Sequence, residues 1–146
     1  MNIKQALKYK NKLAKKIQET AQKVARYNSV DEGVVRPYDV NELLAQLQTL
    51  TEEMVELKTK IHLANRDMYS YIFRLSELKA MVKHMRIVDC TEGVNVSLSR
   101  FGENPTSVKT SVISRLDMDN LIEKLESEID LIQDKLDIHN GTTYLN

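Results

Sequence analysis

A heptad repeat over residues 43–65 constrains the fold more than any other feature of the chain. Apolar side chains recur there at alternating steps of four and three residues: Leu43, Leu47, Leu50, Met54, Leu57, Ile61 and Ala64. Because an α-helix has about 3.6 residues per turn, this spacing places them all on one stripe. Neither glycine nor proline interrupts the repeat, and Asp39 with Glu42 forms the pattern of a capping box. We therefore predict a long helix that begins at Asp39 and buries this stripe.

Three further stretches carry the same kind of apolar stripe. They are residues 3–28 (Ile3, Leu7, Ala14, Ile17, Ala21, Val24), residues 68–88 (Met68, Ile72, Leu75, Leu78, Val82, Met85) and residues 117–140 (Met118, Ile122, Leu125, Ile129, Ile132, Leu136, His139). A loop containing Gly33 and Pro37 separates the first two helices, and Asn65-Arg66-Asp67 separates the next two. Asp117 is the expected N-cap of the last helix, and Gly141 is expected to end it. Short links between long apolar stripes predict antiparallel helical hairpins.

Between the third and fourth predicted helices, apolar side chains recur at every second residue instead of every third or fourth. Val94, Val96 and Leu98 alternate with polar residues, and after Gly102 to Pro105 the alternation returns with Val108, Thr110 and Val112. β-branched residues at a period of two around a glycine- and proline-containing turn favour a β-hairpin over residues 93–113. A flexible polar loop is the alternative.

We therefore predict an all-α protein with one domain over residues 1–146. It consists of two long, coiled-coil-like antiparallel hairpins, residues 1–65 and 66–146, with the β-hairpin inserted into the second. The two halves also resemble each other, since Met54, Leu57 and Ile61 correspond to Ile129, Ile132 and Leu136. An internal duplication would explain this similarity, but so would the heptads that any two amphipathic helices share.

Composition and charge set limits on location and partners. The formal net charge is +0, and Cys90 is the single cysteine, so no intrachain disulfide can form. The first residues lack the apolar core of a signal peptide, and no apolar run approaches the ~18 residues that span a membrane. We expect a soluble, cytoplasmic protein without membrane association.

Three segments of the chain resemble a family of small bacterial proteins described as septicolysin-like. They are Ala6-Leu7 with Leu13 and Ile17, Glu42-Leu43-Leu44 through Ile61 and Asn65, and the closing Asn140-Gly141-Thr142-Thr143-Tyr144-Leu145. Gly141 stands where the family has an aromatic residue, and Leu75-Ser76 replaces an Arg-Asp pair. The resemblance implies a helical fold and no activity. The lysin label suggests a membrane-active toxin, which no apolar segment here supports.

No constellation of residues in the sequence predicts catalysis or a cofactor. His62, His84 and His139 are far apart and lack the spacing of metal ligands, so we expect helix-end roles for His62 and His139. Cys90 is expected to be a buried small hydrophobe rather than a nucleophile. There is no glycine-rich phosphate loop. We predict a non-enzymatic protein without a metal or other cofactor.

The first helix is the most strongly charged segment. Residues 1–26 carry eight basic residues and one acidic residue, whereas residues 117–140 carry eight acidic and two basic residues. Lys4, Lys8, Lys12, Lys15, Lys16 and Lys23 could follow the phosphates of RNA, as the helical arm of some aminoacyl-tRNA synthetases does. The alternative, which we favour, is that these lysines face the acidic fourth helix or water, so nucleic acid is not the expected partner.

A homo-oligomeric scaffold or protein-interaction module is the function that the sequence favours, and an RNA-binding hairpin is the alternative. Tyr69, Tyr71 and Phe73 cannot share one helix face, so at least one is expected to be exposed or in an interface. The other expected interface residues are those of the β-hairpin: Val94, Val96, Leu98, Val108 and Val112. The sequence does not identify a biological process, a protein partner or the number of subunits.

Overall fold

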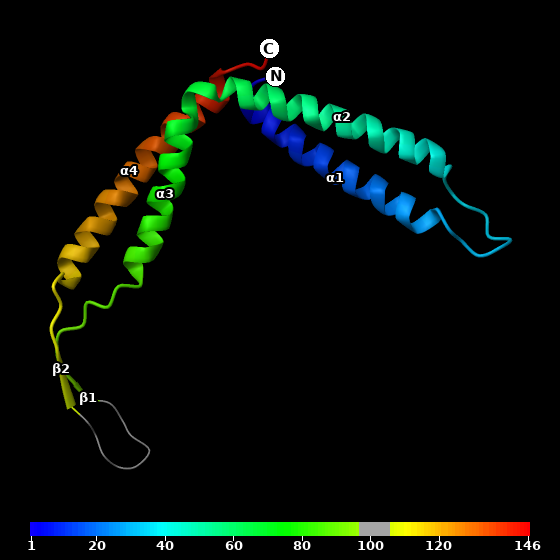
Figure 1. The fold of residues 1–146 in the computed structure, drawn as a ribbon. Helices are drawn as coiled ribbons and strands as arrows, with labels where there is room; N and C mark the ends of the chain where they lie inside the picture. The colour runs from blue at the N-terminus through cyan, green and yellow to red at the C-terminus, as the bar shows by residue number, and fades with distance from the viewer. Residues whose placement is uncertain (97–105) are drawn as a thin grey trace, which may run out of the picture. The chain divides into compact units, whose positions relative to one another are not determined.

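The computed structural model describes residues 1–96 and 106–146. In chain order it contains α1 (Ile3–Tyr27), α2 (Val40–Ala64), the 3₁₀ turn η1 (Arg66–Met68), α3 (Tyr69–Arg86), β1 (Gly93–Val96), β2 (Thr106–Lys109) and α4 (Arg115–Thr142) (Figure 1). The predicted all-α fold with a small β-hairpin between the third and fourth helices is confirmed. Contacts divide the chain into a terminal unit, Met1–Tyr69 with Asp137–Asn146, and a central unit, Ser70–Leu136.

Helices α1 and α2 form an antiparallel hairpin that carries the core of the terminal unit (Figure 1). The start of α1 packs on the end of α2, where Ala6 and Ile61 are both buried in one apolar cluster. At the opposite end of the hairpin the rings of Tyr27 and Tyr38 lie 5.5 Å apart. Leu13, Leu50 and Leu57 complete the buried cluster, so Leu50, Leu57 and Ile61 of the predicted α2 stripe are confirmed as core. Burying each leucine or isoleucine of the cluster contributes roughly 1.5 to 3 kcal/mol.

Short-range hydrogen bonds fix the ends of both helices in this hairpin. Asn2 caps α1 in a capping box with Gln5, and the Asp39 carboxylate caps α2 by accepting from the backbone N–H of Asn41 and Glu42. The guanidinium of Arg36 donates to the carbonyl oxygens of Tyr27 (2.7 Å) and Asn28 (3.1 Å). Arg36 thereby satisfies acceptors that the end of α1 would otherwise leave unpaired.

The two ends of the chain are bonded to each other in the terminal unit. Ile3 N–H donates to the carbonyl of Thr143 (3.0 Å), Leu145 N–H donates to that of Met1 (3.0 Å), and the Asn2 amide donates to that of Gly141 (3.0 Å). The expectation that Gly141 ends the last helix was wrong, because α4 continues through Thr142. Asn2 binds the carbonyl of Gly141, so a tertiary contact stabilises this last turn.

Helices α3 and α4 supply the core of the central unit. Their buried side chains, which come from the predicted stripes, are Leu75, Leu78, Val82, Met118, Leu125, Ile132 and Leu136. Helix α4 begins earlier than expected, because Ser114 rather than Asp117 is the residue that caps it. The Ser114 hydroxyl accepts from the N–H of Asp117 (3.1 Å), which places the Asp117 carboxylate in the first turn, where a negative charge favours the helix.

Helix α3 ends at Arg86, before the end at about Val88 or Cys90 that the sequence predicts, and Cys90 lies beyond it. The side chain of Cys90 is buried, as predicted. The β-hairpin pairs Gly93 with Lys109 and Val94 with Val108 in antiparallel register. Of the residues expected in this hairpin, Thr110 and Val112 lie outside the strands and Leu98 lies outside the described residues.

The Asp89 carboxylate joins the two sides of the base of the β-hairpin. Asp89 accepts hydrogen bonds from the Thr91 hydroxyl, from the Thr91 N–H (2.9 Å) and from the Lys109 ammonium (3.2 Å). The two Thr91 hydrogen bonds and then Lys109 lower the pKa of Asp89 from its ordinary 3.8 to about 2. Because the folded pKa is the lower one, this stabilisation is present above pH 3.8 and is lost as the pH falls through about 2.

We expect an NMR titration of the Asp89 carboxyl carbon to have its midpoint near pH 2, with the Thr91 amide shifting in parallel. In Lys109→Ala the midpoint should rise only in part, because the hydrogen bonds of Thr91 remain and contribute more. An Asp89 midpoint close to 3.8 in the unsubstituted protein would show that these bonds do not form in solution.

Candidate functional site

The three aromatic side chains expected in an interface have separate environments. The hydroxyl of Tyr69 lies 2.5 Å from Nδ1 of His62, within the terminal unit. In the central unit the ammonium of Lys135 donates to the hydroxyl of Tyr71 (2.7 Å), and Phe73 is exposed. The expectation that at least one of the three is exposed is therefore confirmed for Phe73, and its role in an interface stays a prediction.

The β-hairpin presents apolar side chains to solvent. Val94 and Val108 are directly opposite each other in the register, so they lie on the same face, and their exposed fractions are 71% and 73%. Val112 is also exposed. Within the described residues the sheet has only these two strands, so each strand has one edge without a backbone partner.

The lysines of the first helix lie mainly in solvent. Lys4, Lys8, Lys12, Lys15 and Lys16 are exposed, whereas Lys23 is half-buried with its ammonium 4.6 Å from the centre of the Tyr38 ring. Lys15 pairs with Glu19 (3.8 Å) inside the helix. Lys4 and Lys8 line a pocket together with Asp137 and Asn140 of α4, so these two lysines lie beside the end of the acidic fourth helix. Lys12, Lys15 and Lys16 are exposed to water.

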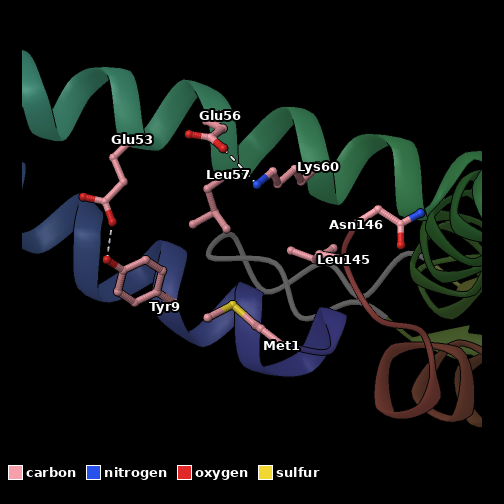
Figure 2. Close-up of a pocket in the computed structure, with 8 residues that line it drawn as sticks. All are labelled: Met1, Tyr9, Glu53, Glu56, Leu57, Lys60, Leu145 and Asn146. Atoms are coloured by element: carbon pink, nitrogen blue, oxygen red, sulfur yellow. Dashed lines mark hydrogen bonds and ion pairs between the residues drawn. The ribbon is translucent and has the colours of Figure 1, made fainter.

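A pocket of about 320 Å³ lies between α1, α2 and the C-terminal tail of the terminal unit (Figure 2). Leu57, Leu145 and Met1 provide its apolar surface. Its polar residues are Tyr9, Glu53, Glu56, Lys60 and Asn146. The lining residues include neither serine, cysteine nor histidine, so the pocket offers an apolar surface and carboxylates to whatever occupies it.

Both carboxylates of this pocket have partners. The Tyr9 hydroxyl donates to Glu53, and this hydrogen bond and the charge of Glu53 raise the pKa of Tyr9 above its ordinary 10.0. Lys60 lies 2.8 Å from Glu56 and lowers the pKa of that carboxyl below its ordinary 4.5. Each carboxylate is thus already hydrogen-bonded across or along the hairpin, and a ligand would have to share or displace these bonds.

His139 joins the end of α4 to the end of α2 inside the terminal unit. Its Nε2 lies 3.2 Å from the carbonyl oxygen of Ala64, and its Nδ1 lies 3.1 Å from the hydroxyl of Thr143. A carbonyl oxygen can only accept, so Nε2 must donate to it. His139 therefore donates to a carbonyl oxygen at the end of α2. The sequence predicted a role for His139 at the end of its own helix, and the structure shows a contact with the end of another. Among residues 1–96 and 106–146, no group of three His, Cys, Asp or Glu side chains could hold a metal ion.

Sequence reasoning did not find the contacts that define the pocket and the joined chain ends. Tyr9 and Glu53 are 44 residues apart, and His139 and Ala64 are 75 apart, so no local spacing connects them. The capping box of Asn2 and Gln5 did have a signal, because an Asn three residues before a Gln is a known helix start.

Comparisons with protein-family models, with curated proteins and with solved structures found no match to this chain. None of the helices that the structure describes is both long and apolar enough to cross a membrane.

Proposed function

We propose that this protein is a non-enzymatic, homo-oligomeric helical scaffold or interaction module of the cytoplasm. The observation that carries the proposal is the apolar surface left on the outer faces of the helices. Leu44, Val55, Leu63, Leu131 and Ile138 all lie off the buried stripes, with exposed fractions between 45% and 71%. Single exposed apolar residues are common, but a repeated series along helices favours a protein contact.

The β-hairpin supports the same proposal from a different part of the chain. An isolated two-stranded hairpin is marginally stable in water, and here Val94 and Val108 gain little from burial. A hairpin of a second subunit would cover this apolar pair and one open edge at once. Two-fold symmetry is the simplest way to make such a contact and close the assembly.

The first test is the mass in solution. We expect size exclusion with light scattering at micromolar concentration to give a multiple of the chain mass of 16.8 kDa. If the contact is in the β-hairpin, a chain lacking residues 94–112 should fall to the monomer mass; if it is on the helices, the assembly should survive. A monomer mass for the unaltered protein would contradict homo-oligomerisation.

An RNA-binding hairpin is the second candidate function, favoured by the exposed lysines of α1. A helix surface that carries Lys4, Lys8, Lys12, Lys15 and Lys16 could neutralise several phosphates in a row. Aromatic side chains that could stack on bases are few on this surface, since Tyr9 already donates to Glu53. For this reason RNA binding ranks second.

We expect mixed RNA to bind only weakly at physiological salt, because few stacking partners accompany the lysines and Asp137 lies beside Lys4 and Lys8 in one pocket. A fluorescence titration with labelled RNA would measure this. The double variant Lys12→Glu with Lys16→Glu should change little, as should Lys58→Glu with Lys79→Glu, the control with exposed lysines outside α1. Tight, strongly salt-dependent binding that only the α1 variant abolishes would favour RNA binding instead.

A further inference from the structure

Helix α1 has a strongly basic face on the side opposite its buried stripe. Ile3, Ala6, Leu13 and Thr20 are the buried residues of this helix. At 100° per residue, Lys4, Lys8, Lys15 and Arg26 lie on the opposite side, and all four are exposed. We call these four residues the basic face. Helix α2 packs on the buried stripe of α1, which is the side opposite the basic face. The side chains of α2 therefore do not cover the basic face.

Helix α2 contributes little to neutralising the charge of the basic face, and at the end of α4 Asp137 lies beside Lys4 and Lys8 in one pocket. The α2 carboxylates next to α1 already have partners, since Glu53 accepts from Tyr9 and Glu56 pairs with Lys60. Lys4 and Lys8 are four residues apart, so two like charges repel each other along the helix. The ion pair Lys15–Glu19 is long and exposed, and it offsets little of this charge.

Helix α4 has a face of opposite charge, also on the side opposite its buried stripe. Its exposed residues there include two carboxylates, Glu123 and Asp134, and three apolar side chains, Leu116, Leu131 and Ile138, with Asn120, Ser127 and Asp130 between or beside them. We call the two carboxylates and the three apolar side chains the acidic face. The exposed fractions of Leu131 and Ile138 are 71% and 66%, so this face combines negative charge with uncovered apolar surface.

Within the described residues, three carboxylates of α4 outside the acidic face pair with a cation, whereas the two carboxylates of the acidic face do not. Glu126 pairs with Arg86 and Glu128 pairs with Arg74, both on α3, and Asp119 lies 3.6 Å from Arg115 in α4 itself. Within residues 1–96 and 106–146, neither Glu123 nor Asp134 takes part in an ion pair. Helix α4 thus has one group of carboxylates that form ion pairs within the chain and another group that does not.

We propose that the basic face of α1 in one copy of this protein docks on the acidic face of α4 in a second copy. This inference rests on the proposed homo-oligomeric function and specifies its contact surface. Charge complementarity favours this pairing, and like charges disfavour α1 on α1 and α4 on α4. The lysine side chains contribute more than charge, since their methylene stems can cover Leu131 and Ile138 while the ammonium groups reach the carboxylates. In a two-fold dimer the contact forms twice.

Charge reversal in trans tests the proposal with the full-length chain. The first variant carries Lys8→Glu with Lys15→Glu, and the second carries Glu123→Lys with Asp134→Lys. We expect each variant alone to dissociate, with a dissociation constant raised at least ~10-fold, because like charges then face each other. An equimolar mixture should regain the wild-type mass, because the acidic α1 of one variant meets the basic α4 of the other. Light scattering measures all three samples.

Controls separate a lost contact from a lost fold. All four substituted positions are exposed, so thermal melting followed by circular dichroism should stay cooperative in both variants. Lys58→Glu with Lys79→Glu changes the same number of exposed charges elsewhere and should leave the mass unchanged. If a reversal does unfold the chain, the milder Lys8→Gln with Lys15→Gln should still weaken association several-fold.

Each other outcome overturns the proposal in a recognisable way. An oligomer that both reversed variants retain would overturn this contact and leave the homo-oligomeric function standing. A monomeric wild-type protein would overturn both. Variants that dissociate but do not recover on mixing would show that the two faces do not meet. An unchanged mass together with loss of RNA binding in the α1 variant would assign the basic face to nucleic acid.

Discussion

We expect Leu50→Asp to abolish the cooperative melting transition of the hairpin formed by α1 and α2. Leu50 is at the centre of α2 and its exposed fraction is 5%, among apolar neighbours that offer a carboxylate no partner. An uncompensated buried charge costs about 3 to 5 kcal/mol. Since small domains are stable by only roughly 5 to 15 kcal/mol, the substitution removes most of the margin. Thermal unfolding, followed by the helix signal in circular dichroism, would measure the effect.

Gln48→Asp is the matched control on the same helix. Gln48 is exposed on the side of α2 opposite the buried stripe, so the new carboxylate stays hydrated. We expect this variant to melt nearly as the unaltered protein does. Equal melting of the Leu50 and Gln48 variants would show that the α2 stripe is not part of the core.

The stripe on α2 could be predicted because helix geometry alone connects its residues. Leu43, Leu50, Leu57 and Ile61 are all buried, and the spacing that selected them requires no knowledge of tertiary structure. The break after Asn65 was also visible, because Asn and Asp favour helix ends. Periodicity thus predicted the elements. On α1 it did not predict the buried face, because Ala6, Leu13 and Thr20 are buried outside the predicted stripe and Ala14 of that stripe is exposed.

Element boundaries were less predictable because they depend on which of several caps is used. Ser114 and Asp117 are both good capping residues, three positions apart, and the structure uses the first as the cap. Gly141 suits a helix end, but the Asn2 amide binds its carbonyl and α4 continues past it. The decisive contact comes from the other end of the chain, where sequence spacing carries no information.

The candidate surfaces were predicted in part. Leu131 and Ile138 do not belong to the apolar stripe predicted for residues 117–140, and both are exposed. Composition identified the excess of lysine on the first helix, but not which carboxylates remain for a partner. That distinction depends on the ion pairs Arg74–Glu128 and Arg86–Glu126, which join residues far apart in sequence. Charge counts alone would have treated all the acidic residues of α4 alike.

The joined chain ends lead to the second large effect, which we expect from Ile3→Ala. The side chain of Ile3 is completely buried, and its N–H donates to the carbonyl of Thr143 (3.0 Å). Truncating a buried isoleucine to alanine costs about 2 to 5 kcal/mol through lost burial and the cavity that remains. Because the same residue anchors the C-terminal tail, the loss should loosen both chain ends together. Hydrogen exchange should become faster at Leu145, whose N–H donates to Met1, as well as at Ile3.

Two comparisons isolate this anchoring role. Ile3→Val keeps most of the buried volume and should cost only about 0.5 to 1.5 kcal/mol, with exchange at Leu145 nearly unchanged. Val35→Ala truncates an exposed apolar residue in the loop before α2 and should change neither stability nor exchange at the chain ends. If Ile3→Ala lowered stability while hydrogen exchange at the Leu145 amide stayed slow, the C-terminal tail would be stabilised by contacts other than those of Ile3. If amide exchange becomes faster at Ile3 and at Leu145 by the same factor, the two chain ends open together. The burial of the Ile3 side chain would then be what stabilises the backbone hydrogen bonds between them.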